Sequence, residues 1–226
     1  MLGKDSNTSR KSLEQEAKQY GDIIQNEFVD SYKNLSYKSY AIFQWVLNFC
    51  HSAKFLLKTD SDVLVNFDVL VQLTKKLVTS NKTIWGKCWF EYPDRDPTRK
   101  WYIPEAEFNG TVYPTFCSGT GYLLTFDSLQ PIVDAAHKHQ FVRLEDVFFT
   151  GILAEKANIT RSHTPQFFKQ PGDSYNCYCP AVTVHAKSAS RVVTLFELHK
   201  QLKQWCKNAT VESKQNNTIS TRKQCR

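Results

Sequence analysis

Apolar residues in the first half of the chain follow two patterns that alternate. Apolar side chains spaced by three or four residues predict helices, and short continuous apolar runs predict strands. The predicted elements are, in chain order, a helix over 12–20, an extended segment over 22–28, a helix over 37–50, strands over 54–58 and 63–65, a helix over 67–78 and a strand over 83–90. Helices and strands that alternate in this way are typical of a layered α/β domain.

The second half of the chain is less regular. Residues 91–114 contain four prolines and few periodic apolar positions, which predicts a long irregular loop of the kind that is often functional. Ser118-Gly119-Thr120-Gly121 predicts a tight turn between apolar flanks. The remaining apolar patterns predict helices over 129–136, from Glu145 and over 193–205, and a strand over 181–185. Because the chain is almost wholly polar from Lys207, we expect one domain over 1–206 and a disordered tail over 207–226.

Size and charge narrow the class of protein. The chain has 226 residues, of which 41% are apolar, enough for one globular domain with a buried core. Its formal net charge is +7, but the basic residues are dispersed, so we expect no nucleic-acid partner. A diffuse positive charge also suits an anionic diphosphate ligand. No apolar stretch approaches the ~18 residues of a membrane helix, and the sequence carries no targeting segment.

Two features indicate a luminal or secreted protein. The glycosylation triplet Asn-x-Ser/Thr occurs seven times, against roughly two expected by chance. The cysteines are scattered and none forms a Cys-x-x-Cys pair, which favours disulfides over a zinc site. The alternatives are triplets that arise freely in an Asn-rich chain and cysteines that are simply small buried side chains. The triplets begin at Asn7, Asn34, Asn81, Asn109, Asn158, Asn208 and Asn216, and the cysteines are Cys50, Cys88, Cys117, Cys177, Cys179, Cys206 and Cys225.

The first candidate site is the segment Lys58-Thr59-Asp60-Ser61-Asp62. Carboxylates two residues apart in an extended segment project the same way. At the end of a strand they lie on the ligand-binding edge of an open α/β sheet. Their oxygens suit Mg²⁺ or Mn²⁺ and leave coordination positions for phosphate oxygens. The alternative is a solvated acidic turn, although the apolar runs on both sides make the segment the exit from a buried strand.

Three further segments carry candidate chemistry, each with a plain structural alternative. Glu145-Asp146 either supplies the acids of a first helical turn or contains a general base for an attacking hydroxyl. Gly119-Thr120-Gly121 either forms a simple turn or lets the backbone approach a ligand closely. His185, after an apolar run, is either structural or completes the ligand shell of a metal together with two Asp.

Together these segments resemble the β-1,3-galactosyltransferase family, whose motifs occur here in the family's order and rough spacing. The resemblance covers about residues 1–185, and the related β-1,3-N-acetylglucosaminyltransferases and N-acetylgalactosaminyltransferases share it. The motifs that carry it are Tyr20-Gly21-Asp22-Ile23, Phe28-Val29-Asp30-Ser31-Tyr32, Asn34-Leu35, Phe55-Leu56-Leu57-Lys58-Thr59-Asp60-Ser61-Asp62-Val63, Lys100-Trp101-Tyr102-Ile103-Pro104, Cys117-Ser118-Gly119-Thr120-Gly121-Tyr122 and Glu145-Asp146-Val147.

The resemblance implies an α/β fold of the GT-A type with a mixed sheet. It implies that a hexose, galactose or an N-acetylhexosamine, moves from a UDP-sugar donor to a glycan acceptor on protein or lipid, with inversion and with Mn²⁺ as cofactor. On this basis Asp60, Asp62 and His185 would be the metal ligands and Asp146 the catalytic base. Ser61 stands where many members have a third Asp, at a position where the change should do little harm. The donor-binding residues would be Lys58, Asp60, Ser61, Asp62, Gly119, Thr120 and Gly121, with the loop over 91–114 closing over the donor.

The resemblance also implies a Golgi protein that faces the lumen, with a membrane anchor that this sequence does not include. Relative to the family, Met1 lies well inside the domain, so we expect an N-terminally truncated domain that lacks part of the uridine site. Two hypotheses therefore stand. The chain is an active glycosyltransferase or part of one, or it is a non-catalytic luminal relative that keeps the fold as a binding module. The truncation favours the second, and the acids Asp60, Asp62 and Asp146 favour the first.

Overall fold

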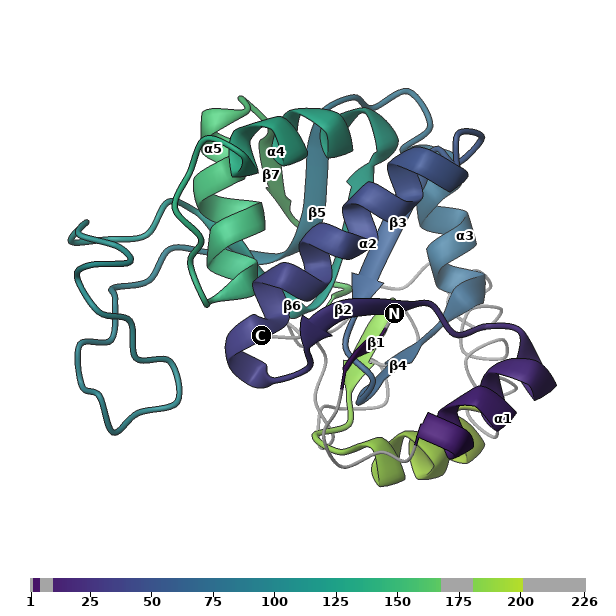
Figure 1. Ribbon diagram of the computed structural model, residues 1–226. Coiled ribbons are helices and arrows are strands. Elements are labelled where there is room, and N and C mark those ends of the chain that lie inside the picture. The colour runs from purple at the N-terminus through teal and green to yellow at the C-terminus, as the bar shows by residue number, and fades with distance from the viewer. Residues whose placement is uncertain (1, 5–9, 168–180, 201–226) are drawn as a thin grey trace.

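The computed structural model describes residues 2–4, 10–167 and 181–200 (Figure 1). Its centre is a four-stranded sheet in the order β3-β6-β5-β7. The strands are β3 (Phe55–Thr59), β5 (Thr83–Trp89), β6 (Phe116–Thr125) and β7 (Thr160–His163). β6 is antiparallel to both β3 and β5, whereas β7 runs parallel to β5. The fold is therefore α/β with a mixed sheet, as the sequence predicts.

The expected tight turn at 118–121 is wrong, because these residues lie inside the continuous strand β6. β6 is paired on either side of this segment, through residues 121–125 with β3 and through residues 116–117 and 122–124 with β5, and the register with β5 shifts between Gly86 and Cys88. The two glycines therefore mark an irregularity within the strand and not its end. The glycines instead allow close packing. A Cβ on Gly121 would lie 3.0 Å from Cγ2 of Thr183, and one on Gly119 would lie 3.4 Å from Cβ of Asp146.

Helices cover both faces of the sheet, and alternate strand residues face each layer. On one face, α2 (Leu35–Phe49), α4 (Leu129–Ala136) and the π-helix η3 (Val147–Leu153) pack around a core that includes Ile84 and Leu124. On the other face, α3 (Phe67–Lys76) packs against a cluster that includes Trp85 and Leu123. Ile84–Trp85 and Leu123–Leu124 are consecutive pairs, so the two-residue period of a strand divides the apolar residues between two cores.

The predicted helices over 37–50, 67–78 and 129–136 are confirmed with small shifts at their ends. α1 (Arg10–Tyr20) ends at Gly21, whose φ of 66° and whose N–H bond to the Ala17 carbonyl are typical of a helix C-terminus. The helix expected from Glu145 is present, but most of it is the π-helix η3, which continues into α5 (Ala154–Lys156). A further helix spans 189–200, and Trp205 and the expected tail over 207–226 lie outside the described residues.

Two small sheets complete the arrangement. β1 (Leu2–Lys4) pairs in parallel with β2 (Gln25–Val29), which confirms the extended segment predicted near 22–28. β4 (Val63–Val65) pairs in antiparallel fashion with β8 (Thr183–His185). The second pairing matters most for function, because it brings a segment from the end of the described chain to the exit of β3.

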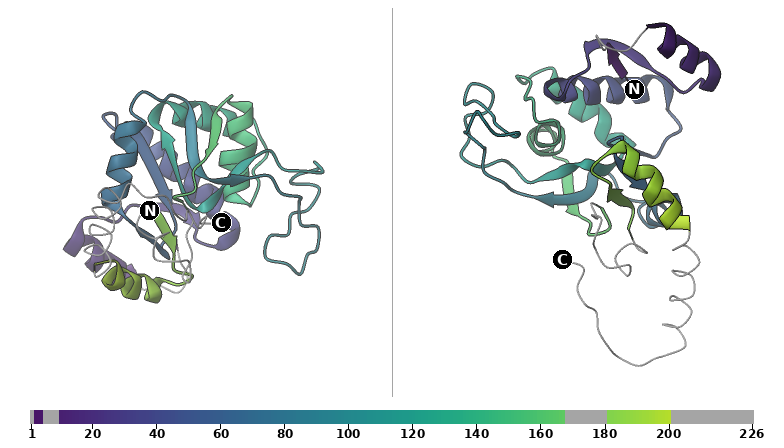
Figure 2. Two further views of the ribbon diagram at one scale, coloured as in Figure 1. Left: turned by 180° about the vertical axis from the view of Figure 1, so that it is seen from behind. Right: turned by 90° about the horizontal axis from the view of Figure 1, so that it is seen from below.

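The predicted loop between β5 and β6 is confirmed, and it projects from one side of the domain (Figure 2). Within it, the guanidinium of Arg95 donates hydrogen bonds to the carbonyls of Ile103, Phe108 and Gly110. A disulfide between Cys88 and Cys117 joins the two strands at its base, which confirms part of the cysteine prediction. Cys50 is the free cysteine of the described residues. Among those residues, no helix combines the length and apolar character needed to cross a membrane.

Candidate active site

The chemistry-bearing segments meet at the end of β3. Lys58 and Thr59 are the last residues of that strand, and they pair in register with Tyr122 and Gly121 of β6. The hydroxyl of Thr59 donates to the Thr120 carbonyl at 3.0 Å. The acidic motif after β3 and the glycine segment of β6, far apart in sequence, are therefore adjacent in space.

Lys58 is the buried cation of this site, with a side chain 8% exposed. Its Nζ donates to Oδ1 of Asp60 and to the carbonyl of Gly119, each at 2.8 Å. It also lies 3.2 Å from Oε2 of Glu145. Burial alone would lower the pKa of Lys58, but the negative charges of Glu145 and Asp60 outweigh burial and raise it. Lys58 is therefore a permanent positive charge at neutral pH.

Glu145 is a buried carboxylate with polar partners from three elements. Its side chain is 4% exposed, and its Oε1 accepts hydrogen bonds from Ser39 Oγ at 2.7 Å and Tyr122 Oη at 2.6 Å. Ser39 belongs to α2 and Tyr122 to β6, while Lys58 approaches from β3. This buried acid is therefore surrounded by two hydroxyl donors and one ammonium group.

Asp146 directly follows Glu145 and faces the glycine segment. Its Oδ2 accepts the backbone N–H of Gly119 at 3.0 Å, and its Oδ1 accepts that of Val147 at 2.9 Å. Burial raises the pKa of Asp146 to about 6, with help from the charge of Glu145, while the two backbone N–H groups and Lys58 partly oppose the shift. A carboxylate with a pKa near the working pH, fixed in direction by two backbone donors, has the properties of a general base.

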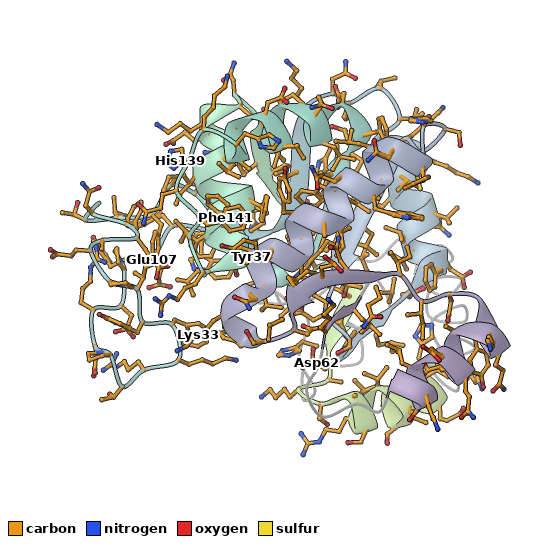
Figure 3. All side chains as sticks on the ribbon, in the orientation of Figure 1. Lys33, Tyr37, Asp62, Glu107, His139 and Phe141 are labelled. Atoms are coloured by element: carbon orange, nitrogen blue, oxygen red, sulfur yellow. A yellow bond between two sulfur atoms is a disulfide. The ribbon has the colours of Figure 1, made fainter. Side chains whose placement is uncertain are left out.

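The third acid, Asp62, is labelled in Figure 3 and is partly open to solvent. Its Oδ2 is 3.1 Å from Nε2 of His185, and the two side chains are 29% and 23% exposed. The pairing of β4 with β8 creates this contact, since Val63 is the register partner of His185. The expectation that a histidine from elsewhere in the chain joins the acidic motif therefore matches the geometry for Asp62.

Asp60 does not join Asp62 and His185, because its carboxylate turns to Lys58. Across the described residues, no group of three or more His, Cys, Asp or Glu side chains is arranged to hold a metal ion. The donor set still fits Mn²⁺ chemically, since Asp62 and His185 supply a carboxylate and an imidazole that are both partly open to solvent. Asp60, with a side chain 40% exposed, is the nearest further carboxylate in the sequence.

The remaining predicted residues differ in their surroundings. Ser61 is exposed between the two acids, and Thr120 contacts the hydroxyl of Ser118 at 2.9 Å. Sequence reasoning missed Ser39 and Tyr122 as partners of Glu145. One signal was available for Ser39, because Ser36 and Ser39 interrupt the apolar stripe of α2 that includes Phe43 and Val46, and all four are buried.

The long loop reaches the same side of the molecule. Lys100 lies over the ring of Tyr32, with 5.0 Å between Nζ and the ring centroid. Burial raises the pKa of Tyr32, the charge of Asp146 adds to the rise, and a hydrogen bond to Trp101 opposes it. Tyr32 and Trp101 remain 48% and 59% exposed. The loop therefore adds exposed aromatic surface beside Tyr32.

A separate hollow of about 470 Å³ lies beside the start of α2. Its lining includes the rings of Tyr37 and Phe141, stacked with centroids 4.4 Å apart, and an ion pair between Glu107 and Arg143. In Figure 3, Tyr37, Phe141 and Glu107 lie near Lys33 and apart from Asp62.

Comparison with known proteins gives a consistent result. The profile of the family described as "Galactosyltransferase" matches residues 1–165. Beta-1,3-galactosyltransferase 5 from Homo sapiens is 37% identical over 161 residues, which cover 70% of this chain and 52% of that protein. Beta-1,3-galactosyltransferase 1 from Mus musculus is 36% identical over 162 residues, 70% of this chain and 49% of that protein. The chain thus spans about half the length of the curated relatives it matches.

Proposed function

Because the chain belongs to the galactosyltransferase family, we propose that it carries the base and the donor-side acids of an enzyme that transfers a hexose from a UDP-sugar to a glycan hydroxyl. One observation carries the proposal. Asp146, with its pKa raised to about 6, is held by Gly119 beside the end of β3, where Asp60 and Asp62 follow. A base at the start of η3 and an acidic diphosphate-side motif at the exit of β3, brought together by Gly119 of β6, are what an inverting transfer requires.

In the proposed reaction the acceptor hydroxyl attacks the anomeric carbon of the donor. Asp146 takes the hydroxyl proton as the new carbon–oxygen bond forms, and the bond to UDP breaks with its electron pair leaving on the diphosphate. Because attack and departure are on opposite faces in a single step, the sugar is transferred with inversion. The two backbone N–H groups that bind Asp146 fix the direction in which its carboxylate can accept the proton.

Asp62 and His185 are the residues that would hold Mn²⁺, and Asp60, whose carboxylate bonds to Lys58, is two residues from Asp62 in the sequence. When bound, the ion supplies positive charge to the diphosphate as negative charge develops on it. The other cation of the site, Lys58, lies behind Asp60 and keeps this edge of the sheet from becoming strongly negative before a ligand binds.

Two exposed aromatic side chains support an acceptor position next to Asp146. Tyr32 is exposed and feels the charge of that acid, and the exposed Trp101 is hydrogen-bonded to Tyr32. Flat aromatic rings suit the apolar face of a sugar while leaving its hydroxyls in water. The hollow lined by Tyr37 and Glu107 borders the same two segments, since Ser36 and Val142 line it and Ser36 bonds to the Val142 carbonyl one turn before Ser39 bonds to Glu145. We propose that further acceptor sugars follow this direction.

The features that indicate the secretory pathway support a Golgi luminal site of action. The disulfide between Cys88 and Cys117 is of a kind that persists in oxidising compartments. Of the glycosylation triplets in the described residues, those at Asn81, Asn109 and Asn158 have exposed asparagines. At Asn34 the side chain instead donates to the Val29 carbonyl at 2.8 Å, and Ser36 of the same triplet is buried.

The test is transfer itself, measured with the protein, Mn²⁺, UDP-galactose or UDP-N-acetylglucosamine, and simple β-linked glycan acceptors. We expect release of UDP that depends on the acceptor, and a product whose new bond is β-1,3 by NMR. UDP binding without any transfer to a broad panel of acceptors would instead support the non-catalytic binding module. If UDP does not bind at all in the presence of Mn²⁺, neither form of the proposal survives.

A further inference from the structure

Lys58 has no donor left for a ligand in this arrangement. A lysine ammonium has three N–H groups, and three protein acceptors surround Nζ, namely Asp60 Oδ1, the Gly119 carbonyl and Glu145 Oε2. With its side chain 8% exposed, Lys58 is also largely hidden from solvent. Its contacts therefore indicate a role in holding protein groups, rather than the direct contact with a diphosphate that the family resemblance suggests.

Glu145 anchors this lysine from the core. Ser39 and Tyr122 fix one carboxylate oxygen of Glu145, so the other oxygen is fixed in direction toward Lys58. The cost of burying an ion is large, and the burial of Glu145 at 4% exposure is compensated only by these partners. A packing role alone would not need a charged side chain here.

The contacts form a chain from the core to the acidic motif. Glu145 binds Lys58, and Lys58 binds Asp60, which is the first residue after β3. Gly119 joins the same chain to the neighbouring acid, because its carbonyl accepts from Lys58 while its N–H donates to Asp146. Two consecutive acids thus serve different partners, since Glu145 faces the lysine and Asp146 faces the glycine segment.

We propose that Glu145 is a positioning residue that acts through Lys58 to hold Asp60 and the donor side of the site. The inference rests on the proposed function, and it assigns opposite kinetic signatures to adjacent acids. Substitution of Glu145 should weaken donor binding and raise KM for the UDP-sugar. Substitution of Asp146 should lower kcat and leave donor binding nearly unchanged.

The test compares UDP affinity in the presence of Mn²⁺, by titration calorimetry, for the parent protein and for E145Q, K58M and the double variant K58M/E145Q. In E145Q the amide oxygen can still accept from Ser39 and Tyr122, but the charge that holds Lys58 is gone. We expect E145Q and K58M each to weaken UDP binding by about tenfold, a typical size for coupled neighbours. The double variant should be no weaker than the worse single variant, because both act along one path.

Glu155→Gln is the matched control. Glu155 is also an acid in an ion pair, with Arg161, and it lies on α5, outside the Lys58 contacts. E155Q should keep the parent UDP affinity, and its melting temperature measures what the loss of one ion pair does to stability alone. With the transfer assay, E145Q should raise KM about tenfold and keep kcat within a few-fold.

A second readout separates positioning from simple structural support. Because the charge of Glu145 helps to raise the pKa of Asp146, E145Q should move the acid limb of the pH–rate profile to lower pH. A variant that lowers only the melting temperature and keeps the parent UDP affinity, KM and pH profile overturns the proposal. So does a double variant whose effect is the sum of both singles. Absence of UDP binding by the parent protein is a different result, and it removes the proposed function together with this inference.

Discussion

Asp146 and Asp62 are both acids of the site, yet their surroundings differ. Both carboxylate oxygens of Asp146 accept backbone N–H groups, and burial raises its pKa to about 6. Asp62 is 29% exposed, and its carboxylate lies 3.1 Å from the His185 ring. A group that must receive a proton in a fixed direction benefits from rigid donors, whereas groups that take up an ion and a diphosphate must stay accessible to both.

The sharpest way to break this comparison is to neutralise Asp146 alone. Asp146→Asn is nearly isosteric and removes the proton acceptor, so we expect kcat to fall by roughly 10²-fold or more. UDP affinity with Mn²⁺ should stay within a few-fold, because Asp62 and His185 are untouched. Asp134→Asn, an exposed acid on α4, is the control and should change neither quantity. Full transfer activity in D146N would show that Asp146 is only the acid of a first helical turn.

The opposite half of the comparison is tested at Asp62. Asp62→Ala removes the carboxylate that lies against His185, and we expect Mn²⁺-dependent UDP affinity to fall by about tenfold or more. The measurement is calorimetric titration of UDP with Mn²⁺ and again with EDTA, and the variant should lose most of the difference between the two. Asp134→Ala serves as control. If D62A binds UDP as the parent does in Mn²⁺, the assignment of this acid to the metal is wrong.

The pH dependence of transfer should follow the protonation of Asp146. A base works when deprotonated, so activity should be full above pH 7 and fall as pH drops through the Asp146 pKa of about 6. Below that value kcat/KM should lose about tenfold per pH unit, as measured in constant-ionic-strength buffers. The residual activity of D146N should lack this acid limb. A parent profile that stays flat from pH 7.5 to 5 would contradict the raised pKa.

The smallest expected effect concerns stability. The pKa of Asp146 is higher in the folded chain than the ordinary value of 3.8. The folded state therefore favours the protonated acid, and stability is lost as pH rises through about 6. D146N removes this pH-dependent cost, although its amide nitrogen must face one of the two backbone N–H groups. Its free energy of unfolding relative to the parent should therefore rise by about 1 kcal/mol between pH 4 and pH 7. Chemical denaturation at several pH values measures this rise. A difference of equal size at every pH would point to a packing effect instead.

Elements with strong apolar periodicity could be predicted from the sequence, and elements decided by tertiary contacts could not. The spacing of apolar residues predicts α2 and α3 because each buries one clear face. The strand β7 was missed, since Thr160–His163 is a polar segment that joins the edge of the sheet. The π-helical form of η3 has no sequence signal of its own, and its buried residues adopt it inside an aromatic core.

The same division holds within the site. Asp60, Asp62, Asp146 and His185 could be singled out because motifs and strand ends point to them. The use of Glu145 as a buried anchor could not, since its partner Ser39 lies 106 residues away in the sequence. Nor could the turn of Asp60 toward Lys58 be foreseen, because it depends on where β6 and the Glu145 segment pack against β3.

The cross-link at the base of the long loop gives the molecule a covalent ring. Cys88 and Cys117 are 29 positions apart, and the loop lies between them. Arg99 and Lys100 are exposed within it and are ordinary cleavage sites for trypsin. A chain cut there stays in one piece until a reductant is added, because the disulfide still joins the two halves beside the register pairs of β5 and β6. A nicked molecule of this kind separates the contribution of the intact loop from that of the folded domain, without any substitution in the sequence.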